Sequence, residues 1–262
     1  MDQIENLKPY EFRALVREGE WGERTTNIFT QYAQFNLVAL PKEYAFDFLL
    51  FCHRNPQACP VVDVTDIGES IPKLVAKDAD LRTDLPKYRV FQDGKMIEEV
   101  SDIKKYWNKD MVGFLLGAAM GFMNILKNNK ITFKDYGGYK TSIKCQSAGI
   151  FKSNMIVTAT SFSCSGDAIR AIQVSSRFPT MHGAPVHIGT PSVIGIEDLS
   201  RPYTFMPKEK INLPKDEEVL LYWGCGVTAE LAAIESKVPF MITHSPGCFF
   251  VSDKLVEEYS VI

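Results

Sequence analysis

The residues best suited to acid–base chemistry are two histidines, His182 and His187, which lie five residues apart in the segment 176–199. Imidazole accepts and donates protons readily near neutral pH. Glycine and proline at positions 183, 185, 189, 191 and 195 exclude a regular helix and predict an irregular loop with a short strand at 193–196. Loops of this kind often carry sites, so both rings are candidate catalytic groups, unless they only hydrogen-bond the loop backbone.

A second candidate segment is the turn Gly224-Cys225-Gly226, between an apolar strand expected at 219–223 and a helix expected at 229–236. Backbone N–H groups at a helix start favour a carboxylate, so the two glycines and Thr228 are predicted to bind substrate. A helix start also lowers a thiol pKa, which makes Cys225 a candidate nucleophile, unless it is only a small residue in a tight turn. The turn matches neither a Walker loop nor a dinucleotide fingerprint.

A third candidate segment begins at His244, directly after a strand expected at 240–243. We predict a catalytic role for His244, with a structural imidazole as the alternative. In open parallel sheets, ligands bind beyond the carboxyl ends of the strands. This topology would make the three segments neighbours around one site.

The first half of the chain supplies polar groups that could hold and activate an acid. The guanidinium groups of Arg54 and Arg82 are suited to bind a substrate carboxylate through two parallel hydrogen bonds. Asp84 is a candidate general base, with a structural Arg–Asp pair as the alternative. Asn36 is either an amide donor in the site or a capping residue. The predicted substrate contacts from this half are Asn36, Arg54, Asn55, Arg82 and Thr83.

Metal binding is the main rival to cofactor-free chemistry. Three histidines and nearby carboxylates could support a metal-dependent hydrolase. However, no His-x-x-x-His pattern falls on an expected helix, and acid–base catalysis needs the same residue types. We therefore predict neither a metal nor a cofactor.

Composition limits the partners of this 262-residue chain. Its net charge of −3 gives no electrostatic case for nucleic acid or an acidic membrane. The first residues lack the features of a signal peptide, the apolar run at 111–125 is short for a membrane span, and six cysteines form no Cys-x-x-Cys pair. We expect a cytoplasmic protein with a small carboxylate or amino-acid substrate and no nucleic-acid or membrane partner, and we leave open a homo-oligomer.

The pattern of elements predicts an α/β fold. Helices are expected at 9–18, 42–52, 109–128, 165–178 and 229–236, and a β-hairpin at 88–100 around Asp93-Gly94. From residue 141 on, strands alternate with helices, which predicts a mostly parallel sheet sandwiched by helices. We assign 1–60 and 125–262 to this main domain, and 61–124 to a smaller α+β domain that contains the hairpin.

Seven motifs in order resemble the D-glutamate cyclase family of hydro-lyases. They lie at 34–41, 51–60, 82–88, 148–151, 182–189, 223–228 and 242–247, within about residues 10–255. The resemblance implies an α/β sandwich with a smaller inserted domain. It also implies a lyase that closes D-glutamate to 5-oxo-D-proline with loss of water and without a cofactor.

The chain also departs from this family's usual pattern. Where a polar Gly-Cys-Ser-Phe-Ser-Phe-Glu helix is typical, residues 117–123 read Gly-Ala-Ala-Met-Gly-Phe-Met. These substitutions remove a thiol, two hydroxyls and a carboxylate. They motivate a second hypothesis, a non-catalytic relative that binds a small acid.

Overall fold

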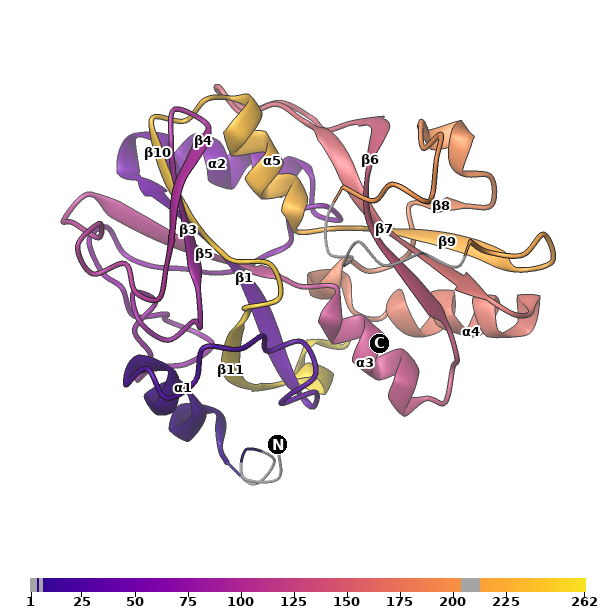
Figure 1. Cartoon of the computed structure of the whole chain (residues 1–262), viewed down its shortest axis with the longest axis horizontal. Helices are drawn as coiled ribbons and strands as arrows, with labels where there is room; N and C mark the ends of the chain where they lie inside the picture. The colour runs from indigo at the N-terminus through magenta and orange to yellow at the C-terminus, as the bar shows by residue number, and fades with distance from the viewer. Residues whose placement is uncertain (1–3, 5–6, 204–212) are drawn as a thin grey trace.

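The protein is built on two β-sheets that lie side by side, with helices packed around them (Figure 1). The computed structural model describes residue 4 and residues 7–203 and 213–262. A seven-stranded sheet has the order β2-β5-β1-β10-β3-β4, with β11 also paired to β1, and a four-stranded sheet has the order β6-β7-β9-β8.

The first half of the chain supplies most of the large sheet. In chain order its elements are α1 (Pro9–Arg17), β1 (Tyr32–Pro41), α2 (Lys42–Arg54), β2 (Val61–Val64), β3 (Tyr88–Gln92), β4 (Lys95–Val100), β5 (Met111–Gly117) and α3 (Met120–Asn128).

The second half supplies the small sheet and then returns to the large one. Its elements are β6 (Lys134–Lys144), β7 (Asn154–Phe162), α4 (Ser165–Ser175), η1 (Pro179–Met181), β8 (His187–Ile188), η2 (Pro191–Ile194), β9 (Val219–Gly224), α5 (Val227–Glu235), β10 (Phe240–His244), β11 (Phe250–Leu255) and η3 (Val256–Tyr259).

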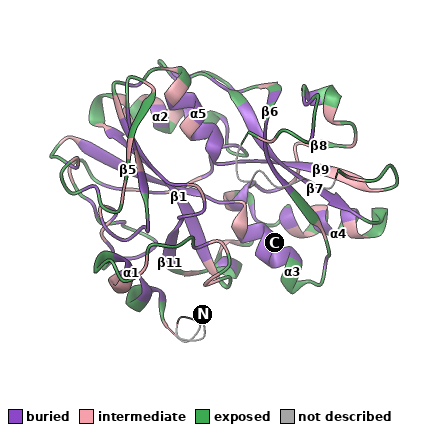
Figure 2. Cartoon of the chain, in the orientation of Figure 1, coloured by how far each residue is buried: buried purple, intermediate pink, exposed green. Residues whose placement is uncertain are grey.

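The mixed α/β class is confirmed, but the predicted parallel sheet is wrong. Every strand pairing in the described part of the chain is antiparallel. Continuous apolar strands are typical of parallel sheets, but they do not determine the direction in which strands pair. Strand β5 is buried along its whole length, and an antiparallel strand in the middle of a covered sheet gives the same apolar pattern (Figure 2).

The long helix expected at 109–128 is also wrong. Residues Met111–Gly117 form the buried strand β5, and only Met120–Asn128 are helical. Gly113 and Gly117 both lie in this strand. A Cβ at Gly113 would come within 2.9 Å of the Trp107 ring, so this strand needs glycine for close packing.

The β-hairpin at 88–100 is confirmed. Strands β3 and β4 pair in antiparallel fashion across Asp93 and Gly94. These two residues have φ values of 50° and 76°, and positive φ at both central positions is what a tight hairpin turn requires.

The strand expected at 193–196 is wrong. Proline at 191 starts the short 3-10 helix η2 instead, which ends at Gly195 in the left-handed region with φ 78°. The nearby strand is the two-residue β8, which pairs with β9 at the edge of the small sheet.

The large sheet draws on both parts of the proposed domain division. Strands β2, β3, β4 and β5 from 61–124 pair with β1 and β10 from outside that range. The division at residues 60/61 and 124/125 stays a prediction.

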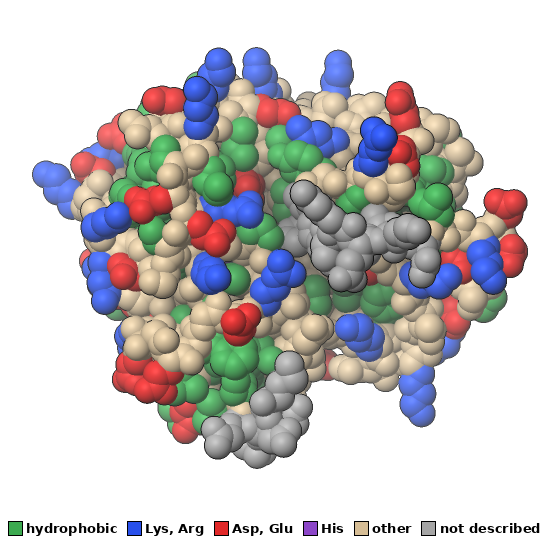
Figure 3. Space-filling view, in the orientation of Figure 1, with side chains coloured by type: hydrophobic (Ala, Val, Ile, Leu, Met, Phe, Trp, Pro, Cys, Tyr) green, Lys and Arg blue, Asp and Glu red, His purple; other side chains and the backbone are tan. Residues whose placement is uncertain are grey.

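Two further features are the distribution of charge on the surface and the length of the helices. On the face drawn in Figure 3, acidic and basic side chains are interspersed. Among the described residues, the helices are too short and too polar for any of them to cross a membrane.

Candidate functional site

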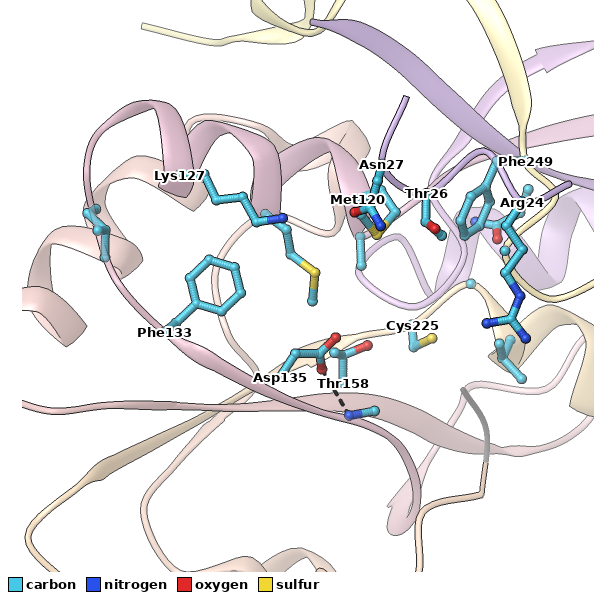
Figure 4. A pocket seen from close by; sticks show the side chains of 18 of the residues that line it. Arg24, Thr26, Asn27, Met120, Lys127, Phe133, Asp135, Thr158, Cys225 and Phe249 are labelled. Atoms are coloured by element: carbon cyan, nitrogen blue, oxygen red, sulfur yellow. Dashed lines mark hydrogen bonds between the residues drawn. The ribbon is translucent and has the colours of Figure 1, made fainter. Parts of the chain in front are cut away.

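A cavity of about 610 Å³ lies between the two sheets (Figure 4). Its walls come from six parts of the chain: the loop before β1, β1 itself, α3 with the loop after it, β6 and β7, the start of α5, and the loop after β10. Cavities of this size commonly hold small ligands. The side chains that matter for its chemistry are Arg24, Asn36, Lys127, Lys130, Asp135, Thr158 and Cys225.

Among the described residues that line this cavity, Asp135 supplies a carboxylate. It stands at the second position of β6, where its side chain opens onto the cavity beside Thr158 (Figure 4). The surrounding protein removes part of its hydration, which raises the pKa of its carboxyl group. The Gly137 N–H donates to Oδ1 at 2.9 Å and Lys127 is nearby, and both oppose that rise. A carboxyl group with a raised pKa is suited to both accepting and donating a proton.

Cationic side chains face Asp135 from two sides. In Figure 4 Lys127 extends from α3 into the cavity on one side, and Arg24 lies on the other, with Asp135 and Thr158 between them. Lys130 also lines the cavity. Over residues 7–203 and 213–262, none of these three cations forms an ion pair with a carboxylate. Their positive charges favour an anionic ligand in the cavity.

Three of the predicted site residues do meet at this cavity: Asn36, Cys225 and Gly226. Asn36 on β1 donates from Nδ2 to the Gly117 carbonyl at 2.7 Å, which fixes its amide at the cavity wall. Gly226 packs directly on that amide, and a Cβ there would overlap Nδ2. The φ of −58° at Gly226 suits any residue, so the backbone conformation does not require glycine there. Glycine is needed because the Asn36 amide packs so close.

The Cys225 thiol does not have the lowered pKa that the sequence predicted. Burial raises the pKa to about 11 and outweighs the hydrogen bonds from the Val227 N–H and the Thr158 side chain, which lower it. The thiol is therefore protonated at neutral pH. Its predicted role as a nucleophile is not supported by this electrostatic environment.

Gly224 and Thr228 serve the packing of the same turn. A Cβ at Gly224 would overlap the Gln57 carbonyl oxygen. The Thr228 hydroxyl donates to the Cys225 carbonyl at 2.7 Å and accepts from the Ile156 N–H at 3.0 Å. Neither residue lines the cavity.

The structure does not bring the three predicted histidines into the cavity. His182 is fully buried, its Nδ1–H donates to the Gln57 carbonyl at 2.8 Å, and burial lowers its pKa to about 4. His187 lies on β8, where its Nε2–H donates to the Thr190 carbonyl at 2.9 Å.

His244 comes nearest to the cavity. Burial lowers its pKa to about 4, and its ring centroid lies 5.1 Å from that of Phe249, which forms part of the wall. The His244 ring therefore packs against Phe249 and does not itself line the cavity. Catalytic roles for the three rings stay predictions, and their positions favour packing and backbone hydrogen bonds.

Asp84 is part of a buried ion-pair network away from the cavity. It accepts from Arg17 at 2.7 and 2.9 Å, from the Thr83 hydroxyl at 2.7 Å and from the Asp80 N–H at 2.8 Å. Arg82 pairs with Asp80 at 2.7 Å. The structural alternative for Asp84, an Arg–Asp pair, is what the geometry favours, although the partner is Arg17 and not the neighbouring Arg82.

Arg54 and Asn55 bind the loop before β7. Arg54 donates to the Ser147 carbonyl, and Asn55 exchanges hydrogen bonds with the backbone of Gln146 at 2.8 and 2.9 Å. These contacts hold the end of α2 against the small sheet. Neither side chain reaches the cavity.

The sequence reading missed Arg24, Lys127 and Asp135. The segment 132–139 is polar and carries no motif, and Lys127 falls near the end of the helix expected at 109–128. One signal was available for Asp135, because it is followed by the small residues Gly137 and Gly138, which leave room beside a strand. No such signal marks Arg24, whose place in the cavity depends on contacts between distant segments.

No metal site is found in the part of the chain that the structure describes. Among these residues, no group of three or more histidine, cysteine, aspartate or glutamate side chains is arranged to hold an ion.

Comparisons with known proteins agree with the sequence resemblance. The D-glutamate cyclase family model matches residues 112–253. Proteins named "Putative hydro-lyase" are similar over nearly the whole chain. One from Bacillus subtilis (strain 168) is 46% identical over 98% of this chain and 100% of its own. One from Geobacillus kaustophilus (strain HTA426) is 46% identical over 96% of both chains, and one from Thermoanaerobacter sp. (strain X514) is 49% identical over 95% and 94%.

Among solved structures, a nitrogen repressor-like protein from Methanococcus jannaschii aligns with 89% of this chain and 91% of its own, at 8% identity and a TM-score of 0.39. A likeness this weak supports no inference. The family match covers more than half of the chain and the relatives cover nearly all of it, so the protein belongs to the D-glutamate cyclase family.

Proposed function

We propose that this protein is a cofactor-independent hydro-lyase that removes water from a small amino or hydroxy acid in the cavity between its two sheets. One observation carries the proposal: Asp135, whose carboxyl pKa is raised, shares the cavity with Arg24, Lys127 and Lys130, for which the described part of the chain shows no ion pair. The hydro-lyase names of the relatives support the reaction class. D-glutamate is the first substrate to test, since the family model is that of D-glutamate cyclase.

The proposed substrate pose follows from the charges. Arg24 binds the α-carboxylate, because guanidinium groups form strong charge-assisted hydrogen bonds with carboxylates. Lys127 and Lys130 bind the side-chain carboxylate on the opposite side. Asp135 then faces the substrate ammonium group, which lies between the two carboxylates.

The proposed reaction needs proton transfer and charge stabilisation from the protein. Asp135 takes a proton from the ammonium group, and the free amine attacks the side-chain carboxyl carbon to form the C–N bond. Lys127 stabilises the negative charge that develops on oxygen. The nitrogen gives up two protons in all, and the departing carboxyl oxygen takes them up, so water leaves and the net charge is unchanged.

A hydroxy acid would use the same groups. Asp135 would remove a proton from the carbon next to the carboxylate, and the neighbouring hydroxyl would leave as water with that proton. The double bond forms from the electrons of the broken C–H bond. Asp135 acts first as base and then as acid, which its raised pKa favours.

The test is turnover followed by proton NMR with D-glutamate, L-glutamate and small hydroxy acids. We expect product signals of a lactam or an alkene with the wild-type protein. Asp135→Asn should reduce kcat at least 100-fold, the lower end of what a general base contributes. The Asn variant keeps an oxygen that can accept from the Gly137 N–H, so the fold should be preserved.

Asp93→Asn is the matched control, because Asp93 is exposed in the hairpin turn far from the cavity. It should turn over at the wild-type rate. Full activity of Asp135→Asn would refute the assigned base. Saturable binding of these acids without any turnover would instead support the non-catalytic binding protein, the second hypothesis from the sequence.

A further inference from the structure

One wall of the cavity is apolar and partly uncovered. We define the α3 wall as Met120, Met123, Ile131 and Phe133, all of which line the cavity. Met120, Met123 and Lys127 are spaced by three and four residues, so they share one face of α3. Met120 and Phe133 are only half-buried, which leaves hydrocarbon surface facing the cavity.

The positions of these side chains are fixed by packing behind them. The Phe133 ring lies against Phe162 with centroids 6.2 Å apart, and Met123 belongs to the buried cluster of α3, α4 and the small sheet. The wall is therefore a preformed apolar surface. Such a surface favours a ligand that covers it with hydrocarbon.

The cavity is larger than glutamate requires. An amino acid of about ten non-hydrogen atoms fills less than about 300 Å³, if each atom takes at most the volume of one liquid water. The cavity holds about 610 Å³. Roughly half of the space, bordered by the α3 wall, would remain unfilled.

We propose that the true substrate is a hydroxy acid with a hydrocarbon side chain of about four carbons or more, which lies along the α3 wall while its carboxylate pairs with Arg24 and its hydroxyl leaves as water. The assignment rests on the proposed function for the identity of the reacting head group. Met120 and Phe133 then determine specificity, because they contact the hydrocarbon chain of the substrate.

The experiment measures binding without turnover. Unbranched monocarboxylates of two, four, six and eight carbons are titrated into the whole protein by calorimetry. None carries an amine or hydroxyl group, so none can react. We expect about fourfold tighter binding per added methylene beyond four carbons, which corresponds to about 0.8 kcal/mol per buried CH₂.

Two variants test whether the hydrocarbon chain of the probe lies against the α3 wall. Met120→Gln keeps the length of the side chain and makes it polar, and Phe133→Leu keeps it apolar and removes the ring. Met120→Gln should weaken octanoate binding at least tenfold and leave acetate binding unchanged, and Phe133→Leu should weaken octanoate less. Met96→Gln, on the exposed strand β4 with 54% of Met96 accessible, should change neither.

Affinity that does not depend on chain length would overturn the proposal, and so would full octanoate affinity in Met120→Gln. If Met120→Gln fails to fold, the wild-type series and Phe133→Leu still decide the matter. Absence of turnover with any acid would refute the proposed hydro-lyase and leave the binding result standing, so the two failures are distinguishable.

Discussion

At the scale of single residues, the surroundings of two carboxylates separate a structural role from a chemical one. Asp84 is buried and accepts hydrogen bonds from Arg17, Thr83 and the backbone of Asp80, so its charge is already satisfied. Asp135 accepts a hydrogen bond from the Gly137 N–H and opens onto the cavity. Proton transfer to a ligand requires a carboxylate oxygen that can accept a proton and that the ligand can reach. Asp135 is therefore the better candidate for the catalytic base.

Arg24→Gln should weaken substrate binding, because the amide keeps polarity but loses the charge that pairs with a carboxylate. A hydrogen bond to a charged group contributes about 1.5–3 kcal/mol, so KM or the Kd of a carboxylate probe should rise at least tenfold. kcat should change less. Calorimetric titration and initial rates measure the two effects.

Arg201→Gln is the control for the Arg24 variant, since Arg201 is 86% exposed, pairs with Asp198 at the surface and is not among the described residues that line the cavity. It should bind the probe with wild-type affinity. An Arg24 variant with unchanged affinity would show that the carboxylate binds elsewhere.

The surroundings of Glu230 should make the stability of the folded protein depend on pH. It is largely buried in α5, 3.8 Å from Arg89, and burial raises its pKa from 4.5 to about 7. The folded state therefore holds this proton more tightly than the unfolded state, and the stability it gives at low pH is lost as pH rises through about 7. The loss between pH 5 and pH 8 should be roughly 2–4 kcal/mol.

Glu230→Gln mimics the protonated form and should escape this loss. Thermal or urea unfolding should show that its stability relative to wild type increases from pH 5 to pH 8. Glu235→Gln, an exposed change in the same helix, should show a constant difference. A constant difference for Glu230→Gln as well would contradict the burial argument.

At the scale of elements, the contact between the start of α5 and β1 shapes the cavity. Gly226 and Asn36 come from the two elements and touch directly, which places Cys225 and Asn36 on the same wall. Loops and caps of this kind hold a site rigid only when the backbones can approach closely.

Gly226→Ala should destabilise the protein by about 1–3 kcal/mol, because its Cβ overlaps the Asn36 amide in a packed region. In a chain of this size, that corresponds to a fall in Tm of several degrees. Calorimetry or circular dichroism measures the shift.

Gly22→Ala serves as the matched control, since no atom lies within 4 Å of a Cβ built there. It should leave Tm nearly unchanged. Asn36→Ala in the Gly226→Ala background should recover part of the lost stability, and no recovery would mean that the overlap lies with another group.

At the scale of the whole molecule, a buried ion-pair network ties together distant parts of the chain. Arg13 in α1 pairs with Asp253 in β11 at 2.8 Å across 240 residues of sequence, and with Asp78 at 2.6 Å. Arg17 pairs with Asp84 at 2.7 Å. Helix α1 is thereby fixed to the large sheet on the side away from the small one (Figure 1).

Asp84→Asn should cost about 1.5–3 kcal/mol of unfolding free energy, because it removes the charge of a buried acceptor of hydrogen bonds from Arg17 and Thr83. Asp66→Asn, which breaks the surface pair with Lys73, should cost at most about 1 kcal/mol. Equilibrium unfolding measures both. A large loss of kcat in folded Asp84→Asn, with little loss of stability, would restore the general-base role that the sequence suggested.

The sequence by itself determined the α/β class, the hairpin at Asp93-Gly94 and most helices, since these follow from local periodicity and turn chemistry. Its motifs also indicated the family. The tertiary structure alone decided that the strands pair in antiparallel fashion, that Asp135 and not Asp84 faces the cavity, and that the three histidines lie outside it. The reason is physical: strand direction, burial and pKa depend on contacts between residues far apart in the chain, and no local pattern encodes those contacts.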